Sequence, residues 1–430
     1  MATSHVNGAI CERGVAEVNE SARRIKVLYV CHEAHWADHH HLMAERETCA
    51  LLKAGIQVSL CTFRGIPDQE APQVVPHRTV VSTWLGYPLD ILTRLRYLTH
   101  TVRHVTKFIE QFSTLCLAVR LRRPLKYNVI YLRDGDPFIF MPFILGLFVK
   151  DHRWAISLIG TRALRSTSSW FYKFVNASLW KPVYRRSFSR NRYTFFCENI
   201  HMKNFFETDH LDGILSGRVR LLPRWVEKPA NHILQRKARA KLGLPEDKAV
   251  FLHFGTLHLG KSVEPILAAI RDLPDALLVH AGYVGHQFNL RRLVERYGLE
   301  SRVIAREHYI PEHEKQHYFS SADAIILSYK KDFVQTASML WEAAKFKLPA
   351  IASESGELGE LVQRYQIGLV FRAEDATSLK TVLSKFLNST QKEREDMGSN
   401  YNKFSDDFSV DTWVHGLVDI ITDLNRDEGG

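Results

Sequence analysis

Residues 255–262 read Gly-Thr-Leu-His-Leu-Gly-Lys-Ser, a glycine-rich turn that ends in a lysine and a hydroxyl side chain. A glycine turn lets the backbone approach a phosphate, the N-terminus of a following helix adds positive dipole, and a lysine adds a full charge. The preceding segment, 249–254, is apolar and β-forming, and the following segment has apolar residues at helical spacing. The pattern therefore predicts a phosphate site between a strand and a helix.

The spacing G-x-x-x-x-G-K-S also fits the phosphate loop of NTPases. Such an enzyme needs a second strand that ends in an aspartate, which helps to hold Mg²⁺. The next predicted strands end in His280-Ala281-Gly282 and in Ser328-Tyr329, and neither end carries a carboxylate. A nucleotide-sugar diphosphate is therefore the favoured ligand. A P-loop NTPase and a chance match to the pattern are the alternatives.

Other polar residues follow predicted strands of the first half of the chain. In open parallel α/β sheets, ligands bind at the carboxyl ends of the strands. Candidates for a ligand-facing wall are His32, Glu33, Arg133, Asp134 and Thr161, with local caps as the alternative for the last three. The histidine-rich run 32–41 also suggests a metal, but consecutive histidines cannot all converge on one ion. We therefore predict no metal site.

Strand and helix patterns alternate along the chain. In the first half, strands are expected at 25–31, 57–62, 128–132, 154–159, 193–196 and 219–223. In the second half, they are expected at 249–254, 276–280, 302–304, 324–327 and 350–352. Because this alternation is typical of parallel sheets and 430 residues exceed what one core serves, two doubly wound α/β domains are predicted.

The domain limits follow from these patterns. We expect a flexible tail over 1–22, a Rossmann-like domain over 23–226, a second over 242–405, and a terminal helix with a tail over 406–430. The helix is expected because apolar residues recur at helical spacing over 410–424.

Charge is divided unequally between the halves. Residues 1–225 contain 31 Lys and Arg against 18 Asp and Glu, a net +13, and the remainder has 26 against 29, a net −3. Apolar residues from Ile91 to Phe112 recur every three or four positions and the opposite face is basic, which predicts an amphipathic helix. An anionic membrane surface or a phosphate- or lipid-linked substrate would explain that face, and so would simple solvation. Aromatic residues are too sparse there to favour nucleic acid.

The spacing of the cysteines and the length of the apolar runs indicate in which cellular compartment the protein is expected. Six cysteines without a Cys-x-x-Cys pair are typical of reduced thiols. The first 22 residues lack the apolar stretch of a secretory signal, and the longest uncharged apolar run, 137–149, is too short to span a bilayer. We therefore expect a cytoplasmic protein, with peripheral attachment to the inner face of a membrane as an extension.

The second half resembles glycosyltransferase family 4, whose members are retaining, nucleotide-sugar-dependent enzymes of GT-B fold. The family's donor domain opens with a strand and G-R-x-x-x-x-K-G, which Gly255 and Lys261 match. Its second hallmark, E-x7-E followed by A-x-x-x-G-x-P-V-I-A-S, is matched by Glu-Ala at 342–343 and Pro-Ala-Ile-Ala-Ser at 349–353. Ser-Ala-Asp-Ala at 321–324 resembles the family's A-D-V stretch. The likeness spans about residues 25–400.

The resemblance implies a GT-B architecture of two Rossmann-like domains that face a cleft. It implies transfer of a hexose-type unit from a UDP- or GDP-sugar to a sugar, lipid-linked or polysaccharide acceptor, without a cofactor. Lys261 would stabilise the diphosphate leaving group and Glu342 would accept the ribose hydroxyls, so these are the candidate catalytic residues. The other candidate donor-binding residues are Gly255, Thr256, Tyr309, Thr336 and Ser338. An ordinary N-cap is the alternative for Thr336 and Ser338, and a packed loop aromatic for Tyr309.

Three positions depart from the family pattern. Thr256 replaces the arginine of the loop, Val334 stands where the first glutamate of E-x7-E belongs, and Lys347 replaces the glycine before the proline. Because that glutamate lies near the donor sugar in the family, a catalytically inactive GT-B binding module is a further alternative. Asp332 is a candidate substitute, with a surface acid as its other interpretation.

Overall fold

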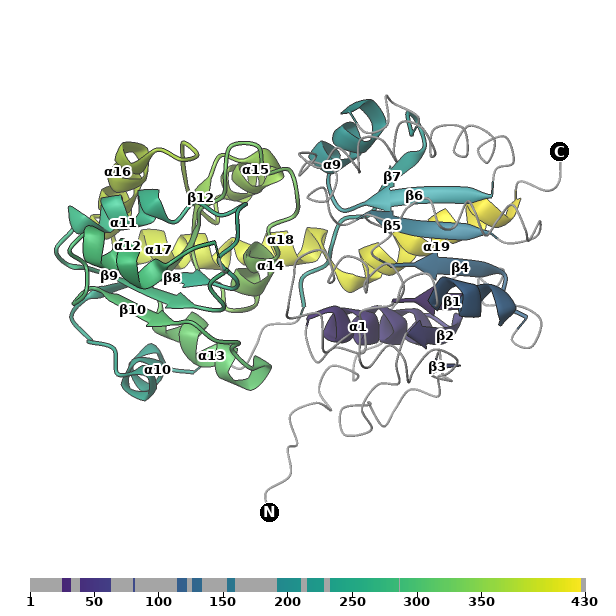
Figure 1. Cartoon of the computed structure of the whole chain (residues 1–430), viewed down its shortest axis with the longest axis horizontal. Helices are drawn as coiled ribbons and strands as arrows, with labels where there is room; N and C mark the ends of the chain where they lie inside the picture. The colour runs from purple at the N-terminus through teal and green to yellow at the C-terminus, as the bar shows by residue number, and fades with distance from the viewer. Residues whose placement is uncertain are drawn as a thin grey trace, which may run out of the picture. The chain divides into compact units, whose positions relative to one another are not determined.

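The computed structural model describes residues 25–31, 39–62, 80–81, 114–121, 126–133, 153–158, 192–209, 215–227, 233–285 and 287–426. The amphipathic helix expected over 91–112 and the candidates His32, Glu33, Asp134 and Thr161 lie outside these residues and stay predictions. The chain divides into two compact units, Met1–Pro223 with Val410–Gly430, and Arg224–Ser409 (Figure 1).

The first unit contains a parallel sheet. Its strands are β1 (Lys26–Val30), β2 (Gln57–Thr62), β3 (Val80–Val81), β4 (Val129–Leu132), β5 (Trp154–Leu158), β6 (Tyr193–Cys197) and β7 (Val219–Leu221). They are arranged in the order β3-β2-β1-β4-β5-β6-β7, and each neighbouring pair is parallel. This order begins as the Rossmann order 3-2-1-4-5-6 does.

Helices of the first unit include α1 (His39–Lys53), α9 (Ile200–Asn204) and α19 (Val410–Arg426), with a π-helical turn, η6, at Phe205–Asp209. The terminal helix expected over 410–424 is therefore present. It contacts α1, β5 and β6, and Figure 1 shows it in yellow alongside those strands. Arg220 of β7 forms an ion pair with Asp423 of this helix at 2.6 Å. Within the described residues, no helix combines the length and apolar character needed to cross a bilayer.

The second unit repeats the topology. Its strands are β8 (Ala249–Phe254), β9 (Ala276–Ala281), β10 (Val303–Arg306), β11 (Ala324–Leu327), β12 (Ala350–Ser353) and β13 (Gly368–Phe371). Their order is β10-β9-β8-β11-β12-β13, and every pair is parallel. Numbered from the first strand of the unit, this is again 3-2-1-4-5-6, so the prediction of two Rossmann-like doubly wound domains is confirmed.

Helices cover both faces of this second sheet. They are α10 (Gln235–Leu242), α11 (Glu264–Arg271), α12 (Leu290–Arg296), α13 (Glu312–Ser321), α14 (Ser338–Lys345), α15 (Gly356–Tyr365), α16 (Ala376–Leu387), α17 (Gln391–Ser399) and α18 (Tyr401–Asp407). Along β8, Phe251 packs in the core that contains α11 and α16, whereas Leu252 packs in the core of α13, α14 and α15. Successive side chains of a strand point to opposite faces, so β8 is apolar at every position except His253 because both of its faces are buried.

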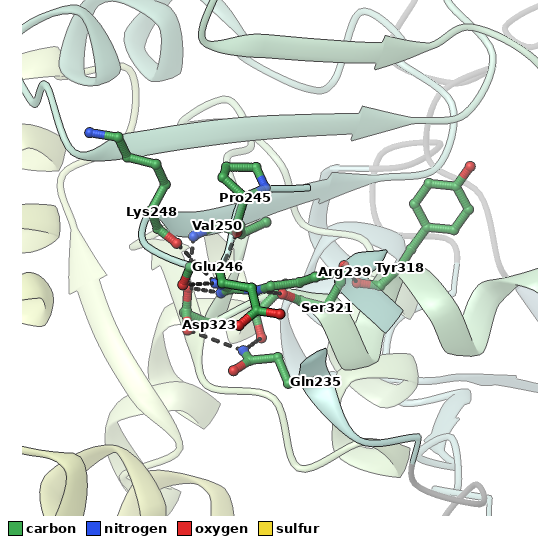
Figure 2. Close-up of polar contacts among 10 residues, drawn as sticks. Gln235, Arg239, Pro245, Glu246, Lys248, Val250, Tyr318, Ser321 and Asp323 are labelled. Carbon is green, nitrogen blue, oxygen red and sulfur yellow. Dashed lines mark hydrogen bonds and ion pairs between the residues drawn. The ribbon is translucent and has the colours of Figure 1, made fainter. Parts of the chain in front are cut away.

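Asp323, the acid of the A-D-V stretch, organises the amino end of this sheet. Its carboxylate accepts hydrogen bonds from the backbone N–H of Val250 at 2.7 Å and from Arg239 of α10 at 2.8 Å. Arg239 is buried and also donates to the carbonyls of Ser321, Pro245, Glu246 and Lys248 (Figure 2). The acid therefore has a structural role: it joins the starts of β8 and β11 to α10, and the guanidinium is compensated by a carboxylate and four carbonyls.

The described cysteines are free thiols. Cys61 and Cys197 lie in the core of the first unit, where burial raises the pKa of each thiol to about 12. Both thiols stay protonated at pH 7, so these two residues are inert packing groups, as the sequence predicted for cysteines in apolar runs.

Lys347 explains one departure from the family pattern. It follows the last turn of α14 with φ at +52°, the left-handed conformation that glycine adopts without strain. The N–H of Leu348 reaches the carbonyl of Ala343 and the N–H of Lys347 reaches that of Ala344, which is the Schellman arrangement of a helix C-terminus. The backbone turn of the family is thus retained although its glycine is absent.

We therefore expect Lys347→Gly to raise the free energy of unfolding by about 0.5–1 kcal/mol, because it removes the cost of holding a Cβ atom in the left-handed region. Urea unfolding measures the change. Lys347→Ala is the control: it removes the charge and retains the Cβ, so no gain is expected. An equal gain in both variants would contradict the backbone explanation.

Candidate functional site

The turn after β8 brings Gly255 and Lys261 together. Gly255 leaves the strand with φ at +85°, and the Lys261 side chain folds back so that its Nζ donates to the carbonyl of Phe254 at 2.7 Å. A Cβ atom on Gly255 would lie 3.6 Å from that Nζ. The lysine is only 5% exposed. A fixed ammonium group therefore lies at the carboxyl end of β8, the end at which open α/β sheets bind ligands.

The backbone of the same turn argues against the P-loop interpretation. In a P-loop, successive backbone N–H groups around the lysine point at the phosphates. Here the N–H of Lys261 donates to the carbonyl of His258 at 2.8 Å, and that of Ser262 donates to Ser328 at 3.0 Å. The following helix, α11, begins only at Glu264, an acidic residue that would repel a phosphate. Residues 255–262 therefore match the sequence pattern of a P-loop but do not adopt its backbone geometry.

Gly282 fixes the position of Gly255 from the neighbouring strand. The N–H of Gly255 donates to the carbonyl of Ala281 at 2.8 Å, and the two glycine backbones touch. A Cβ atom on Gly282 would lie 2.6 Å from the carbonyl carbon and oxygen of Gly255. Only a glycine permits this approach, and its φ of +145° is also unfavourable for other residues. The loop after β9 is therefore a support for the loop after β8.

Two buried histidines hold that support in place. His253 of β8 and His280 of β9 are directly opposite in the parallel register, with their Nδ1 atoms 3.0 Å apart. The Nε2 atom of His280 lies 3.1 Å from the carbonyl oxygen of Gly282. Since a carbonyl only accepts, that Nε2 carries the proton, and the Nδ1 of His280 accepts from the Nδ1–H of His253. This chain of hydrogen bonds orients the peptide of Gly282.

The histidine pair is uncharged at neutral pH. Burial, followed by the nearby charge of Lys261, lowers the pKa of His280 to about 4 and lowers the pKa of His253 well below 6.5. A second charge beside the lysine is therefore avoided. Lys261 therefore carries a positive charge beside two neutral imidazoles.

Helix α14 lies beside the same turn. The Sδ atom of Met339 is 3.8 Å from the position that a Cβ atom on Gly255 would take. Met339 and Glu342 are three residues apart on this helix and so share one of its faces. Glu342 is 14% exposed, and its Oε2 lies 2.9 Å from Nζ of Lys345 and 3.9 Å from Nζ of Lys315. The loop lysine and the helix carboxylate thus belong to one side of the second unit.

The remaining donor candidates lie at the carboxyl ends of neighbouring strands. Thr256 is exposed after β8, and Tyr309 is 43% exposed after β10. Ser338 begins α14, and Thr336 immediately precedes that helix. Thr256 lies within the turn that contains Lys261, and the other three lie after other strands of the same sheet. Their donor-binding roles stay predictions.

The segment that carries Val334 keeps a fixed backbone. Gly356 begins α15 with φ at +52°, and a Cβ atom there would lie 2.7 Å from the carbonyl oxygen of Phe333. The ring of Phe333 also stacks on that of Tyr329, with centroids 4.0 Å apart. Val334 therefore replaces the family's glutamate on a backbone that is tightly held, and Asp332 two residues earlier is exposed.

Arg133 is the described candidate from the first unit. It follows β4, is 5% exposed, and forms an ion pair with Glu47 of α1. The other oxygen of Glu47 accepts from the hydroxyls of Tyr29 at 2.7 Å and Tyr131 at 2.8 Å. Arg133 is thus part of a buried polar network that holds α1 on the sheet, and a role toward an acceptor stays a prediction.

In the part of the chain that the structure describes, no group of three His, Cys, Asp or Glu side chains is arranged to hold a metal ion.

Several residues of the site were missed by sequence reasoning. Met339, His253, His280 and Lys345 carry no motif of their own. The histidines had one usable signal, because each lies near the end of a predicted strand and the two strands are neighbours in a Rossmann order. The contact of Met339 with the turn depends on how α14 packs, which the sequence pattern does not specify.

Comparison with known proteins identifies the second unit. The model of the family described as "Glycosyl transferases group 1" matches residues 235–404, which include Gly255, Lys261 and Glu342. The sequence finds no match among curated proteins.

Solved structures with two such units are similar to nearly the whole chain. Sucrose-phosphate synthase from Thermosynechococcus elongatus matches with a TM-score of 0.65 at 16% identity, over 94% of this chain and 100% of that one. WaaG, a glycosyltransferase involved in lipopolysaccharide biosynthesis, matches with a TM-score of 0.59 at 14% identity, over 94% and 100%. Anabaena HepE in complex with UDP and glucose matches with a TM-score of 0.57 at 14% identity, over 93% and 100%. The fold is GT-B.

Proposed function

We propose that this chain is a glycosyltransferase with a nucleotide-sugar donor, since residues 235–404 match the model of the glycosyl transferases group 1 family. We further propose that Lys261 and Glu342 bind opposite ends of a UDP- or GDP-sugar. The observation that carries the proposal is the approach of Met339 to Gly255, because its Sδ atom lies 3.8 Å from the position of a Cβ atom on Gly255 and α14 bears Glu342 on the same face as Met339.

The proposed chemistry at Lys261 is electrostatic. Breaking the bond between the sugar and the diphosphate builds negative charge on the leaving oxygen, and an ammonium already held in place stabilises that charge without reorganisation. The hydrogen bond from Lys261 to the Phe254 carbonyl supports this preorganisation. The lysine supplies the positive charge that a divalent cation supplies in other transferases, so we propose a metal-independent reaction. Retention of configuration is proposed from the family resemblance.

Glu342 is proposed to bind the ribose. A carboxylate has two acceptor oxygens, which suits the paired 2′- and 3′-hydroxyls of a ribonucleotide. Its partial burial strengthens such hydrogen bonds, because the surroundings are less polar than water. Tyr309 after β10 is proposed to contact the base, and Thr336 and Ser338 the second phosphate, since N–H groups at the start of α14 can donate to an anion.

The acceptor is proposed to be phosphate- or lipid-linked and to be met at an anionic membrane surface. The support is the net charge of +13 on residues 1–225. WaaG, which has the same fold, is involved in lipopolysaccharide biosynthesis. Flotation with vesicles of anionic and of neutral lipids tests the proposal. We expect binding to the anionic vesicles that is lost at high salt; recovery of the protein in the unbound fraction at low salt would contradict it.

The donor proposal predicts which nucleotides stabilise the protein. We expect UDP or GDP to raise the melting temperature without Mg²⁺, since a ligand at 100 times its dissociation constant adds about 2.7 kcal/mol of stability. Thermal unfolding with UDP, GDP, ADP and ATP, each with and without Mg²⁺, measures this. Stabilisation by ATP and Mg²⁺ alone would support the P-loop NTPase alternative. No stabilisation by UDP or GDP, together with no hydrolysis of their sugar forms, would indicate the inactive binding module.

A further inference from the structure

Glu342 belongs to a partly buried group of charged side chains that the donor motif does not account for. We name this group the Glu342 cluster; its members are Glu227, Glu312, Lys315, Glu342 and Lys345. Three carboxylates and two ammonium groups meet there, and all five residues belong to the second unit. Charged side chains are rarely buried unless they are paired. The reason why these charged side chains are placed together therefore needs an explanation.

Lys345 is the centre of the cluster. Its Nζ lies 2.9 Å from Oε2 of Glu342, donates a hydrogen bond to Oε2 of Glu227 at 3.0 Å, and lies 3.7 Å from Oε1 of Glu312. The side chain is 8% exposed. A buried ammonium with three carboxylates around it has little freedom to move. Lys345 is thus a fixed point to which the Glu342 carboxylate is tied.

Lys315 of α13 supports the same carboxylate from a second helix. Its Nζ lies 3.9 Å from Oε2 of Glu342 and 2.6 Å from Oε2 of Glu312. Both lysines therefore approach one oxygen of Glu342, which restricts rotation of the carboxylate about its terminal bond.

We propose that Lys345, assisted by Lys315, is a positioning residue for the donor nucleotide. It orients the carboxylate of Glu342 so that it accepts the ribose hydroxyls, and Lys345 itself does not touch the nucleotide. The inference rests on the proposed function, because it assumes that Glu342 is the ribose ligand. An ionised carboxylate has about four acceptor sites, so binding two lysines does not prevent it from accepting two hydroxyls. The competing explanation is that Lys345 only neutralises Glu227 and stabilises the fold.

Preference for ribose over deoxyribose separates these explanations. Affinities of the full-length wild type and of Lys345→Met are measured by calorimetry for UDP, 2′-deoxy-UDP, GDP and 2′-deoxy-GDP. For the wild type, we expect roughly 10- to 100-fold tighter binding of the nucleotide that carries the 2′-hydroxyl, the effect of one hydrogen bond to a charged group. In Lys345→Met, we expect the preference to fall below about threefold, mostly through weaker binding of the ribonucleotide. If Lys345 had only a structural role, Lys345→Met would weaken binding of the ribonucleotide and of the deoxyribonucleotide equally. The ratio of the two affinities would then be the same as in the wild type.

Controls distinguish charge, position and folding. Lys345→Arg keeps the charge and is expected to retain most of the preference. Lys380→Met, a change on α16 that breaks an exposed ion pair with Asp272 at the end of α11, is expected to change neither affinity. If Lys345→Met is too unstable for binding measurements, Glu227→Gln removes the negative charge that anchors Lys345, and the preference is expected to fall by about two- to fivefold.

Each outcome is decisive. A wild-type preference that survives unchanged in Lys345→Met, or in Glu227→Gln where that variant stands in, overturns the inference and leaves the proposed function intact. A wild type that binds neither UDP nor GDP overturns the proposed function itself, and the inference with it. A wild type that binds UDP and 2′-deoxy-UDP equally refutes the ribose role of Glu342 while leaving that of Lys261 standing.

Discussion

Lys261→Met lowers the rate of hydrolysis of the sugar donor by about 10²–10³-fold in our account, the loss typical when one preorganised charge interaction is removed. Methionine has a similar length and no charge, so it fills the space beside Gly255 and cannot stabilise the diphosphate. Affinity for UDP or GDP is expected to fall roughly 10- to 100-fold, because the hydrogen bond to a charged donor is lost. Donor hydrolysis and calorimetric titration with both nucleotides measure the two effects.

Lys248→Met is the matched control for this variant. Lys248 lies just before β8, at the opposite end of the same strand, and pairs with the exposed Asp275 at 2.8 Å. Both variants remove one positive charge from the second unit, so a general electrostatic effect would appear in both. Similar losses in the two variants, or an unchanged affinity in Lys261→Met, would mean that the turn after β8 does not bind the diphosphate.

Gly282→Ala is expected to damage both stability and nucleotide binding. The added methyl group would lie 2.6 Å from backbone atoms of Gly255, which cannot rotate away as a side chain can, so β8 and β9 must separate at their carboxyl ends. We expect a loss of about 2–5 kcal/mol in the free energy of unfolding, from overpacking and backbone strain together. Affinity for UDP or GDP should fall more than about tenfold, because the turn that carries Lys261 is displaced.

Gly298→Ala provides the comparison. Gly298 has a positive φ of +64°, and a Cβ atom there would meet nothing within 4 Å. Its substitution therefore carries the backbone penalty alone, about 1 kcal/mol, and should leave nucleotide affinity unchanged. Urea unfolding and calorimetry on both variants give the result. If Gly282→Ala were no worse than Gly298→Ala, the contact between the two loops would not be a support for the site.

The fold was predictable because both sheets are buried on two faces. The strand β11 is a continuous apolar run and β8 is apolar except for His253, and the ends of both agree with the sequence prediction. The strand β13, Gly-Leu-Val-Phe, was not predicted, since four apolar residues are equally typical of a packed loop. Its pairing with β12 depends on Gly368, where a Cβ atom would collide with the backbone of Ala350. That requirement is visible only once the two strands are side by side.

The site was predictable only where a motif carried it. Gly255 and Lys261 were expected to share a turn, and they do. The Glu342 cluster was not expected, because Glu227, Lys315 and Lys345 are far apart in the chain and an isolated lysine is most often a solvated charge. Lys347 shows the reverse case: the family's glycine is absent, yet the left-handed turn that the glycine would serve is present. Backbone geometry at this position is preserved by the hydrogen bonds of the helix end and not by residue type.

A crystal structure of the protein with UDP or GDP bound tests the central claim most directly. We predict that the diphosphate lies within hydrogen-bonding distance of Lys261 Nζ and that the hydroxyls of the same nucleotide's ribose donate to the Glu342 carboxylate. A nucleotide that contacts one of these side chains and lies away from the other, or that is bound elsewhere on the chain, would contradict the account.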